Sequence, residues 1–158
     1  MTTSTSTAPH GMPTMLPHLT VKDGRAAMAF YEKALGATEM FSLDGPDGRL
    51  MHGSMCVNGA AFMLMDEFLE HNAKSPKSLG GTPVGIHLWV DDVDEAFDRA
   101  IAAGSTPIMK PADMFWGDRY SVVEDPFGHH WSFAKHLKDM SPDDIKSAMM
   151  SAPPMDCA

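Results

Sequence analysis

The chain of 158 residues suits one domain or two small modules that share a core, and its 44 % hydrophobic and 21 % charged residues are typical of a globular protein. A formal net charge of −9 argues against a nucleic-acid partner, because there is no basic stripe to neutralise phosphates. No apolar run approaches the roughly 18–20 residues of a membrane span, so no membrane partner is expected. Cys56 and Cys157 form neither a CxxC pair nor a disulfide framework, which makes a reducing cytoplasm the expected compartment.

The first fourteen residues are rich in Ser, Thr and Pro. They lack the charged start and apolar core of a secretory signal. We expect residues 1–14 to be a disordered leader.

A short apolar strand is predicted to begin near Pro17 and to end at Asp23. Asp23 can cap a helix whose apolar positions recur at helical spacing until Gly36 stops it. Three strands are expected next, at about 38–43, 49–57 and 60–66, with a Gly/Pro-bearing turn at 44–48 between the first two. This first module spans residues 15–66, and the polar stretch 67–83 is predicted to be a linker.

The same order of elements is predicted for residues 84–137, the second module. A strand beginning near Ile86 ends at an aspartate, and Asp92 can cap a helix with Glu95 as its capping-box partner, up to Gly104. Strands are then expected at about 105–109, 119–124 and 129–135. Residues 138–158 form the tail, in which Ser141 can cap a further helix.

The two modules are an internal repeat with a constant offset of 69 residues. His18 and His87 begin matching His-Leu-x-Val-x-Asp segments, and Gly59 and Gly128 each open a last strand. The predicted fold is therefore α+β, with two βαβββ modules in tandem. Two related curved sheets form a half-barrel with a cavity between them, where small ligands usually bind.

Three segments carry a resemblance to a known family. The helix AFYEKALGA, the strand and helix GIHLWVDDVDEAF, and WGDRYSVVEDPFGHHW resemble the vicinal oxygen chelate superfamily, and in particular its PhnB-like, glyoxalase/bleomycin-resistance branch. The likeness covers about residues 16–136. It implies a small-molecule ligand and a homodimer, since these sheets commonly complete a barrel between chains.

The resemblance also implies four metal-ligand positions. In metal-using members, one ligand lies five residues before the closing Val of each first strand and another four residues after the glycine of each last strand. Here those positions are Leu16, Gly85, Met63 and Ser132. Leucine and glycine side chains have no donor, a thioether suits Ni, Zn, Fe or Mn poorly, and a serine hydroxyl is a weak ligand. We therefore expect no metal at the family positions.

A displaced site is the alternative for a divalent Ni, Zn, Mn or Fe ion. His18, His87 and His130 each lie two residues from a family position on the same strand face, and Asp66 or Glu67 could join them. Because the two first strands should run antiparallel, each shift of about 6.6 Å would carry His18 and His87 apart. The alternative to a metal site is that His18 and His87 are cavity-facing or interior histidines, hydrogen-bonded to neighbours or to a ligand. The remaining histidines of the modules and the linker are expected at the surface: His52, His71, His129 and His136.

The second module carries all three tryptophans of the chain. Trp89 shares a strand face with His87, and Trp116 and Tyr120 lie at the predicted cavity mouth, so each could contact a planar ligand. Trp131 alternates to the opposite face and is predicted to be core. By resemblance Arg119 could hold a carboxylate or phosphate-like group; the alternative is an ion pair with Asp118, Glu124 or Asp125.

Four functions stay open on the sequence alone. The first is a metal-independent protein that binds a small organic molecule, as bleomycin-binding members do. The second is a metal-dependent lyase, isomerase or dioxygenase of the glyoxalase type, in which the metal polarises substrate oxygens. The third is a metal-free enzyme with His18 or His87 as the catalytic base. The fourth is a protein that acts only through an interface.

Overall fold

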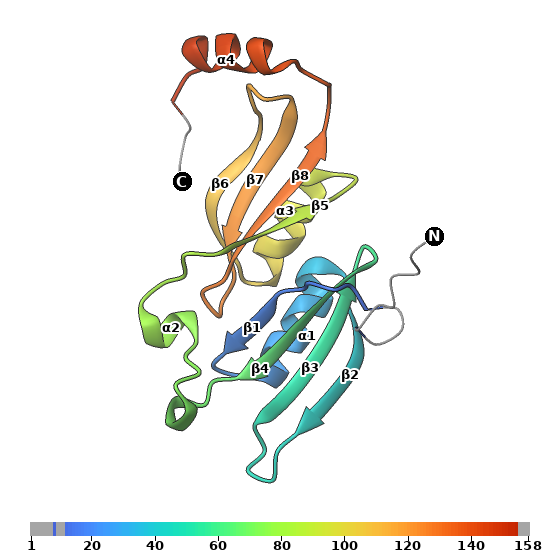
Figure 1. Ribbon diagram of the computed structural model, residues 1–158, viewed down its shortest axis with the longest axis vertical. Coiled ribbons are helices and arrows are strands. Elements are labelled where there is room, and N and C mark those ends of the chain that lie inside the picture. The colour runs from blue at the N-terminus through green and yellow to red at the C-terminus, as the bar shows by residue number, and fades with distance from the viewer. Residues whose placement is uncertain (1–7, 9–11, 155–158) are drawn as a thin grey trace, which may run out of the picture.

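The computed structural model describes residue 8 and residues 12–154. The first module begins with a strand, passes through a helix and returns in three further strands (Figure 1). Asp23 caps the helix by accepting from the Ala26 backbone N–H, and Gly36 ends it in the left-handed conformation, as predicted. The elements are β1 (His18–Val21), α1 (Gly24–Leu35), β2 (Thr38–Asp44), β3 (Leu50–Val57) and β4 (Ala60–Asp66).

The second module repeats this order. Asp92 caps its helix by accepting from the Glu95 backbone N–H. Its elements are β5 (Gly85–Trp89), α3 (Val93–Ala103), β6 (Thr106–Asp113), β7 (Asp118–Glu124) and β8 (His130–His136). A 3-10 helix (Leu69–His71) and α2 (Pro76–Leu79) lie between the modules, and α4 (Pro142–Ser151), capped by Ser141, follows the second.

Each module forms its own four-stranded sheet, ordered β1-β4-β3-β2 and β5-β8-β7-β6. β1 pairs in parallel with β4, and β5 pairs in parallel with β8; the other pairings are antiparallel. In Figure 1 the sheets stand end to end along the long axis, and α1 and α3 pack against each other near their junction. One face of each sheet is covered by its helix, and we call the opposite face the open face.

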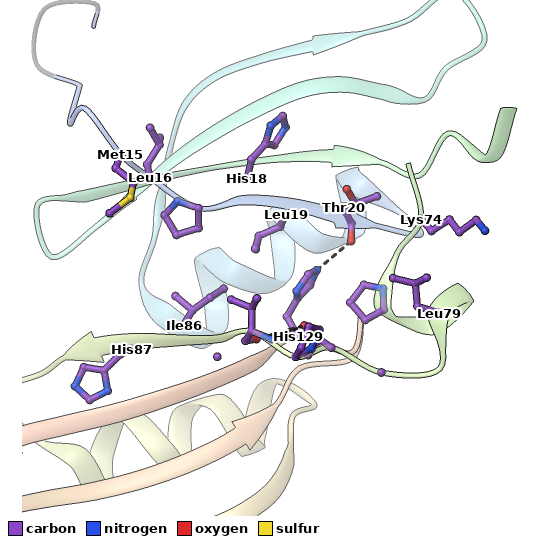
Figure 2. A pocket seen from close by; sticks show the side chains of 17 residues that line it. Met15, Leu16, His18, Leu19, Thr20, Lys74, Leu79, Ile86, His87 and His129 are labelled. Carbon is purple, nitrogen blue, oxygen red and sulfur yellow. Dashed lines mark hydrogen bonds between the residues drawn. The ribbon is translucent and has the colours of Figure 1, made fainter. Parts of the chain in front are cut away.

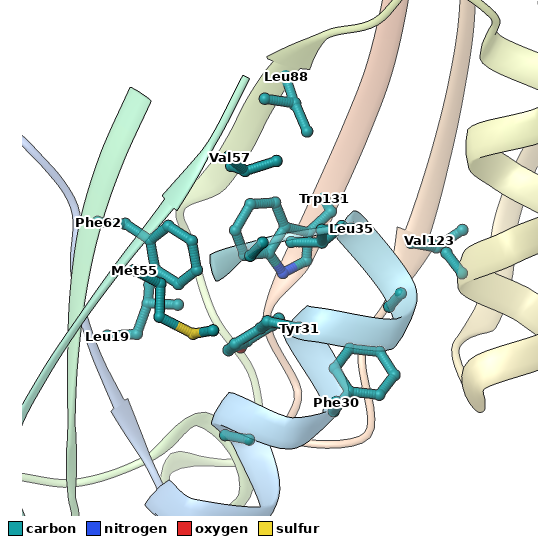
Figure 3. Close-up of a cluster of buried hydrophobic side chains, with 14 of the residues drawn as sticks. Leu19, Phe30, Tyr31, Leu35, Met55, Val57, Phe62, Leu88, Val123 and Trp131 are labelled. Atoms are coloured by element: carbon teal, nitrogen blue, oxygen red, sulfur yellow. The ribbon is translucent and has the colours of Figure 1, made fainter. Parts of the chain in front are cut away.

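A single core joins the modules. Tyr31 from α1, Phe62 from β4 and Trp131 from β8 pack ring against ring with centroids 5.4–5.6 Å apart (Figure 3). Trp131 is only 2 % exposed, which confirms the prediction that it belongs to the core. The buried carboxylate of Asp125 accepts from the Tyr31 hydroxyl at 2.7 Å and from Trp131 Nε1 at 3.0 Å.

Two parts of the chain differ from the sequence-based expectations. β6 runs to Asp113 rather than to about residue 109, in spite of Pro107 and Pro111. Since it is an edge strand with irregular register, it tolerates prolines that cannot donate to a ladder. The linker contains α2, a short helix that the sequence analysis did not predict; Ser75 caps it and, with Ser78, donates to Glu67. The predicted disorder of residues 1–14 falls mostly outside the described residues.

Candidate functional site

A cavity of about 610 Å³ lies where the two modules meet (Figure 2). Its walls come from β1 and the residues before it, from β5, and from α2 and the segment that follows it. The lining is mainly apolar, with Lys74 contributing a cationic side chain. Three histidines also line it: His18, His87 and His129.

His129 joins the two modules across this cavity. Its Nε2 lies 3.0 Å from the backbone oxygen of Thr20, a contact that Figure 2 marks with a dashed line. The side chain is 8 % exposed, so the expectation of a surface histidine is wrong. The sequence pattern missed this because the partner lies 109 residues away, on the first strand of the other module.

His18 and His87 extend from β1 and β5 in different directions (Figure 2). The third member of the displaced metal set, His130, lies by Glu124, with its Nε2 3.2 Å from Oε2 of that carboxylate. Among residue 8 and residues 12–154, no three His, Cys, Asp or Glu side chains gather closely enough to hold a metal ion. The structure therefore does not bring His18, His87 and His130 together as one ligand set.

The four family positions offer a poor donor set for a divalent metal. Leu16 and Gly85 line the cavity without a ligating side chain. Met63 supplies a soft thioether, and the Ser132 hydroxyl already lies 2.8 Å from His87 Nδ1. Hard and borderline divalent ions prefer oxygen and nitrogen ligands, so these residues do not fit such an ion.

An aromatic cluster covers the open face of the second sheet next to the cavity. The ring of His87 packs edge-on against Trp89, with centroids 4.8 Å apart, and stacks on Tyr120 at 6.0 Å with planes 20° apart. Trp116 packs against Tyr120 at 5.7 Å. Trp89 is 54 % exposed, so this cluster presents ring faces and edges on the surface. The structure thus gathers four of the sequence-predicted ligand-binding residues.

Hydrogen bonds orient this cluster. Ser132 lies opposite His87 in the parallel β5–β8 register and holds the imidazole through its hydroxyl. Trp116 donates from Nε1 to the Asp118 carboxylate at 2.9 Å. Because both rings are tied to neighbours on the same sheet, the cluster has a defined shape before any ligand arrives.

Arg119 lies on the helix side of the second sheet. Its guanidinium donates to Asp94 of α3 at 2.5 and 2.7 Å and to Asp113 of β6 at 2.8 Å. Strand alternation explains the position, since Tyr120 faces the open side and its neighbour must face the other. Arg119 therefore forms ion pairs, as the alternative in the sequence analysis proposed. Its partners are Asp94 and Asp113, and not Asp118, Glu124 or Asp125.

His52 is a residue that the sequence reasoning did not bring into a site. It lies on β3, and its ring stands 6.3 Å from that of His18, centroid to centroid. Burial, and then the proximity of His52, lower the pKa of His18 from its usual value, which favours the neutral imidazole. The alternation of residues along β3 indicates the face on which His52 lies. The strand order of the sheet is also needed to place His52 near β1.

The comparisons with known proteins identify the family. The model of the glyoxalase/bleomycin resistance protein/dioxygenase superfamily matches residues 11–133. The chain belongs to this superfamily, as the sequence motifs suggested. Within the described residues, no helix is long and apolar enough to cross a membrane.

Several known proteins are similar to this chain in sequence or in structure. It is 46 % identical over 142 residues to an uncharacterized protein of Mycobacterium tuberculosis, covering 88 % of this chain and 84 % of the relative. TioX from Micromonospora has a similar structure, with 26 % identity, a TM-score of 0.61, and coverage of 78 % of this chain and 98 % of TioX. The fosfomycin resistance protein FosX from Listeria monocytogenes, solved with Mn(II) and sulfate, shares the fold at 19 % identity and a TM-score of 0.57, covering 82 % and 93 % of the two chains.

Proposed function

We propose that the protein binds a small planar organic molecule on the aromatic open face of the second module, beside the cavity between the modules. The proposal also takes the binding to be independent of a divalent metal at the family positions. The observation that carries it is the cluster of His87, Trp89, Trp116 and Tyr120, preorganised by Ser132 and Asp118.

The chemistry of the cluster selects the ligand class. Exposed aromatic rings favour offset or edge-to-face contacts with another ring, and each such contact contributes about 0.5–1.5 kcal/mol beyond the area it buries. The apolar cavity adjoining His87 can take an aliphatic or aromatic substituent, while Lys74 favours an anionic group at its edge. A planar, mainly apolar molecule with a carboxylate or phenolate fits both the aromatic cluster and the cavity beside it.

A second copy of the chain is part of this proposal. The first sheet exposes a row of large apolar side chains on β2 and β3: Met40, Phe41, Leu43 and Met51. Burying them against another copy would cover both open faces and complete the ligand site. Light scattering at micromolar concentration should give the mass of a dimer. A monomer under these conditions would contradict this part.

Membership of the PhnB-like branch also belongs to the proposal. It is supported by the helix motif AFYEKALGA and the second-module motif WGDRYSVVEDPFGHHW. Neither motif specifies a substrate, so the site geometry and not the branch carries the functional argument.

Ligand binding can be tested by isothermal titration calorimetry, whose signal does not depend on the exposed Trp89 that the variants replace. A panel of planar aromatic carboxylates and phenols would be titrated into the protein. For a compound that binds, Trp89→Ala should weaken the affinity at least tenfold, which is about 1.4 kcal/mol. Trp89→Phe should retain most of it. Leu69→Ala, an exposed apolar residue away from the cluster, is the matched control.

The metal independence is tested in the same titration. Affinity that is unchanged after treatment with a chelator supports the proposal. Affinity that disappears with the chelator and returns with Mn(II), Ni(II) or Fe(II) would instead support the glyoxalase- or dioxygenase-type alternative. Equal affinity in Trp89→Ala and wild type would show that the ligand binds elsewhere.

A further inference from the structure

Two imidazoles of the first module lean toward each other over the strand that separates them. His18 lies opposite Met63 in the β1–β4 pairing. On the other side of β4, the β3 register pairs Gly53 with Leu64, which places His52 opposite Met65. Their ring centroids nevertheless stand only 6.3 Å apart.

The distance between the two imidazole rings indicates what could lie between them. Two imidazoles joined by a direct hydrogen bond would have to be closer than this, since the nitrogens must approach to about 3 Å. Within the described part of the chain, neither ring makes a hydrogen bond to a protein atom. With metal–nitrogen bonds of about 2.0–2.1 Å, two imidazoles that share one ion have ring centroids roughly 5 Å apart at a tetrahedral angle and roughly 6.4 Å apart when the ion lies on the line between them. The observed 6.3 Å matches an ion held between the two rings in a nearly linear arrangement.

The remaining donors at this place are soft. Met63 and Met65 are two residues apart on β4, so their side chains lie on the same face of the sheet as the two imidazoles, between β1 and β3. Both methionines are partly buried. No Asp or Glu side chain completes a group of three potential metal ligands there among residue 8 and residues 12–154. Thioethers with neutral imidazoles suit a soft monovalent cation and disfavour hard divalent ions.

We propose that His18 and His52, with the thioethers of Met63 and Met65, bind one soft monovalent cation, Cu(I) or Ag(I), on the open face of the first module. The four side chains supply two nitrogen and two sulfur donors with no net charge. This site shares only Met63 with the family's metal positions, and it is independent of the organic ligand proposed for the second module.

The experiment is a competition titration of Cu(I) against a chromophoric chelator in the absence of oxygen. The full-length protein is used with Cys56→Ser and Cys157→Ser, so that thiols do not bind the ion. We expect one Cu(I) per chain. His18→Ala and His52→Ala should each weaken the affinity at least tenfold. His71→Ala removes a histidine of the linker, outside the pair, and should change the affinity less than twofold.

Two further measurements keep the test decisive if an alanine variant folds poorly. His52→Tyr gives this position the aromatic side chain found at the corresponding place of the second module, and it should lose Cu(I) while keeping its circular dichroism spectrum. X-ray absorption of the loaded protein should show both nitrogen and sulfur neighbours.

The proposal fails if all variants bind Cu(I) equally, because the ion is then held by methionines elsewhere in the chain. A shell of sulfur neighbours alone would overturn it in the same way. It also fails if Zn(II) is bound and is lost in His18→Ala and His52→Ala while Cu(I) binding is kept.

Discussion

The open faces of the two modules present the same geometry with different chemistry. In the first, His18 approaches His52 across β4; in the second, His87 approaches Tyr120 across β8. The strand registers make these pairs equivalent, because the β3–β4 register continued one residue beyond Gly53–Leu64 sets His52 opposite Met65, just as Tyr120 pairs with Ala134. The ring separations, 6.3 and 6.0 Å, are nearly the same.

The residue beneath each pair decides what the pair can do. Under His87 the Ser132 hydroxyl satisfies one ring nitrogen at 2.8 Å. Under His18 the equivalent residue is Met63, whose thioether has no proton to donate. The second module therefore holds a fixed imidazole beside exposed rings, whereas the first leaves two imidazoles among soft donors. The two modules thus share one arrangement of strands and differ in the side chains that their open faces present.

The largest effect should come from removing the support that both faces share. Asp125→Ala would leave the Tyr31 hydroxyl, the Trp131 N–H and two backbone N–H groups without their acceptor. We expect a loss of about 3–5 kcal/mol in the free energy of unfolding, measured by urea denaturation. Asp139→Ala, an exposed carboxylate, should change it by less than about 0.5 kcal/mol. If Asp125→Ala and Asp139→Ala lowered the free energy of unfolding by similar amounts, the core would not depend on Asp125 as a shared support of the two modules.

The next comparison uses two equivalent glycines. Gly59 and Gly128 both adopt positive φ, at 77° and 91°. A Cβ at Gly59 would meet nothing within 4 Å, whereas one at Gly128 would lie 2.9 Å from Pro76 Cβ. Gly59→Ala should cost about 1–2 kcal/mol from backbone strain alone. Gly128→Ala should cost a further ~1–3 kcal/mol from the clash. Equal thermal unfolding midpoints would show that α2 moves aside freely.

A smaller change tests the role of the hydroxyl under His87. Ser132→Ala removes one hydrogen bond and should lower the free energy of unfolding by about 1 kcal/mol. It should also weaken a ligand of the aromatic cluster, because the His87 ring loses its anchor. Met63→Ser gives the first module the same hydroxyl and should weaken Cu(I) there. If Ser132→Ala leaves ligand affinity unchanged, the hydrogen bond has no part in preorganising the cluster.

The smallest expected effect is the pH dependence of stability that His136, on β8 of the second module, contributes. Asp118 first, and then Asp139, raise the pKa of His136 above its usual value. The stabilisation is therefore fully present below the ordinary histidine pKa and is lost as the pH rises through the raised pKa. NMR titration should show His136 titrating above pH 6.5. Asp118→Asn should bring the pKa back more than Asp139→Asn does; the reverse order would contradict the assignment.

Much of the frame was predictable because local chemistry determines it. The caps Asp23 and Asp92 and the C-terminal glycines Gly36 and Gly104 each satisfy helix-end groups within a few residues, so the sequence pattern predicts the helix bounds closely. The alternation of β8 correctly assigned Trp131 to the core and Ser132 to the other face.

The contacts that the sequence could not supply are those between distant strands. Thr20 and His129 are 109 residues apart, and His18 and His52 are on strands that do not pair with each other. Arg119 was placed by analogy with relatives, yet its side chain reaches Asp94 on α3. Periodicity gives the face on which a side chain lies, but strand order and helix packing decide its neighbour.

The hydrogen bond between Tyr31 and Asp125 determines whether the two modules can be produced as separate fragments. Each half of the repeat contributes one partner to it, and the aromatic core around it draws Phe62 from one half and Trp131 from the other. A fragment that ends after residue 66 would expose Tyr31 and Phe62 to water and leave the phenol without its acceptor. Such a half-protein should aggregate when produced alone and become soluble when both fragments are produced together.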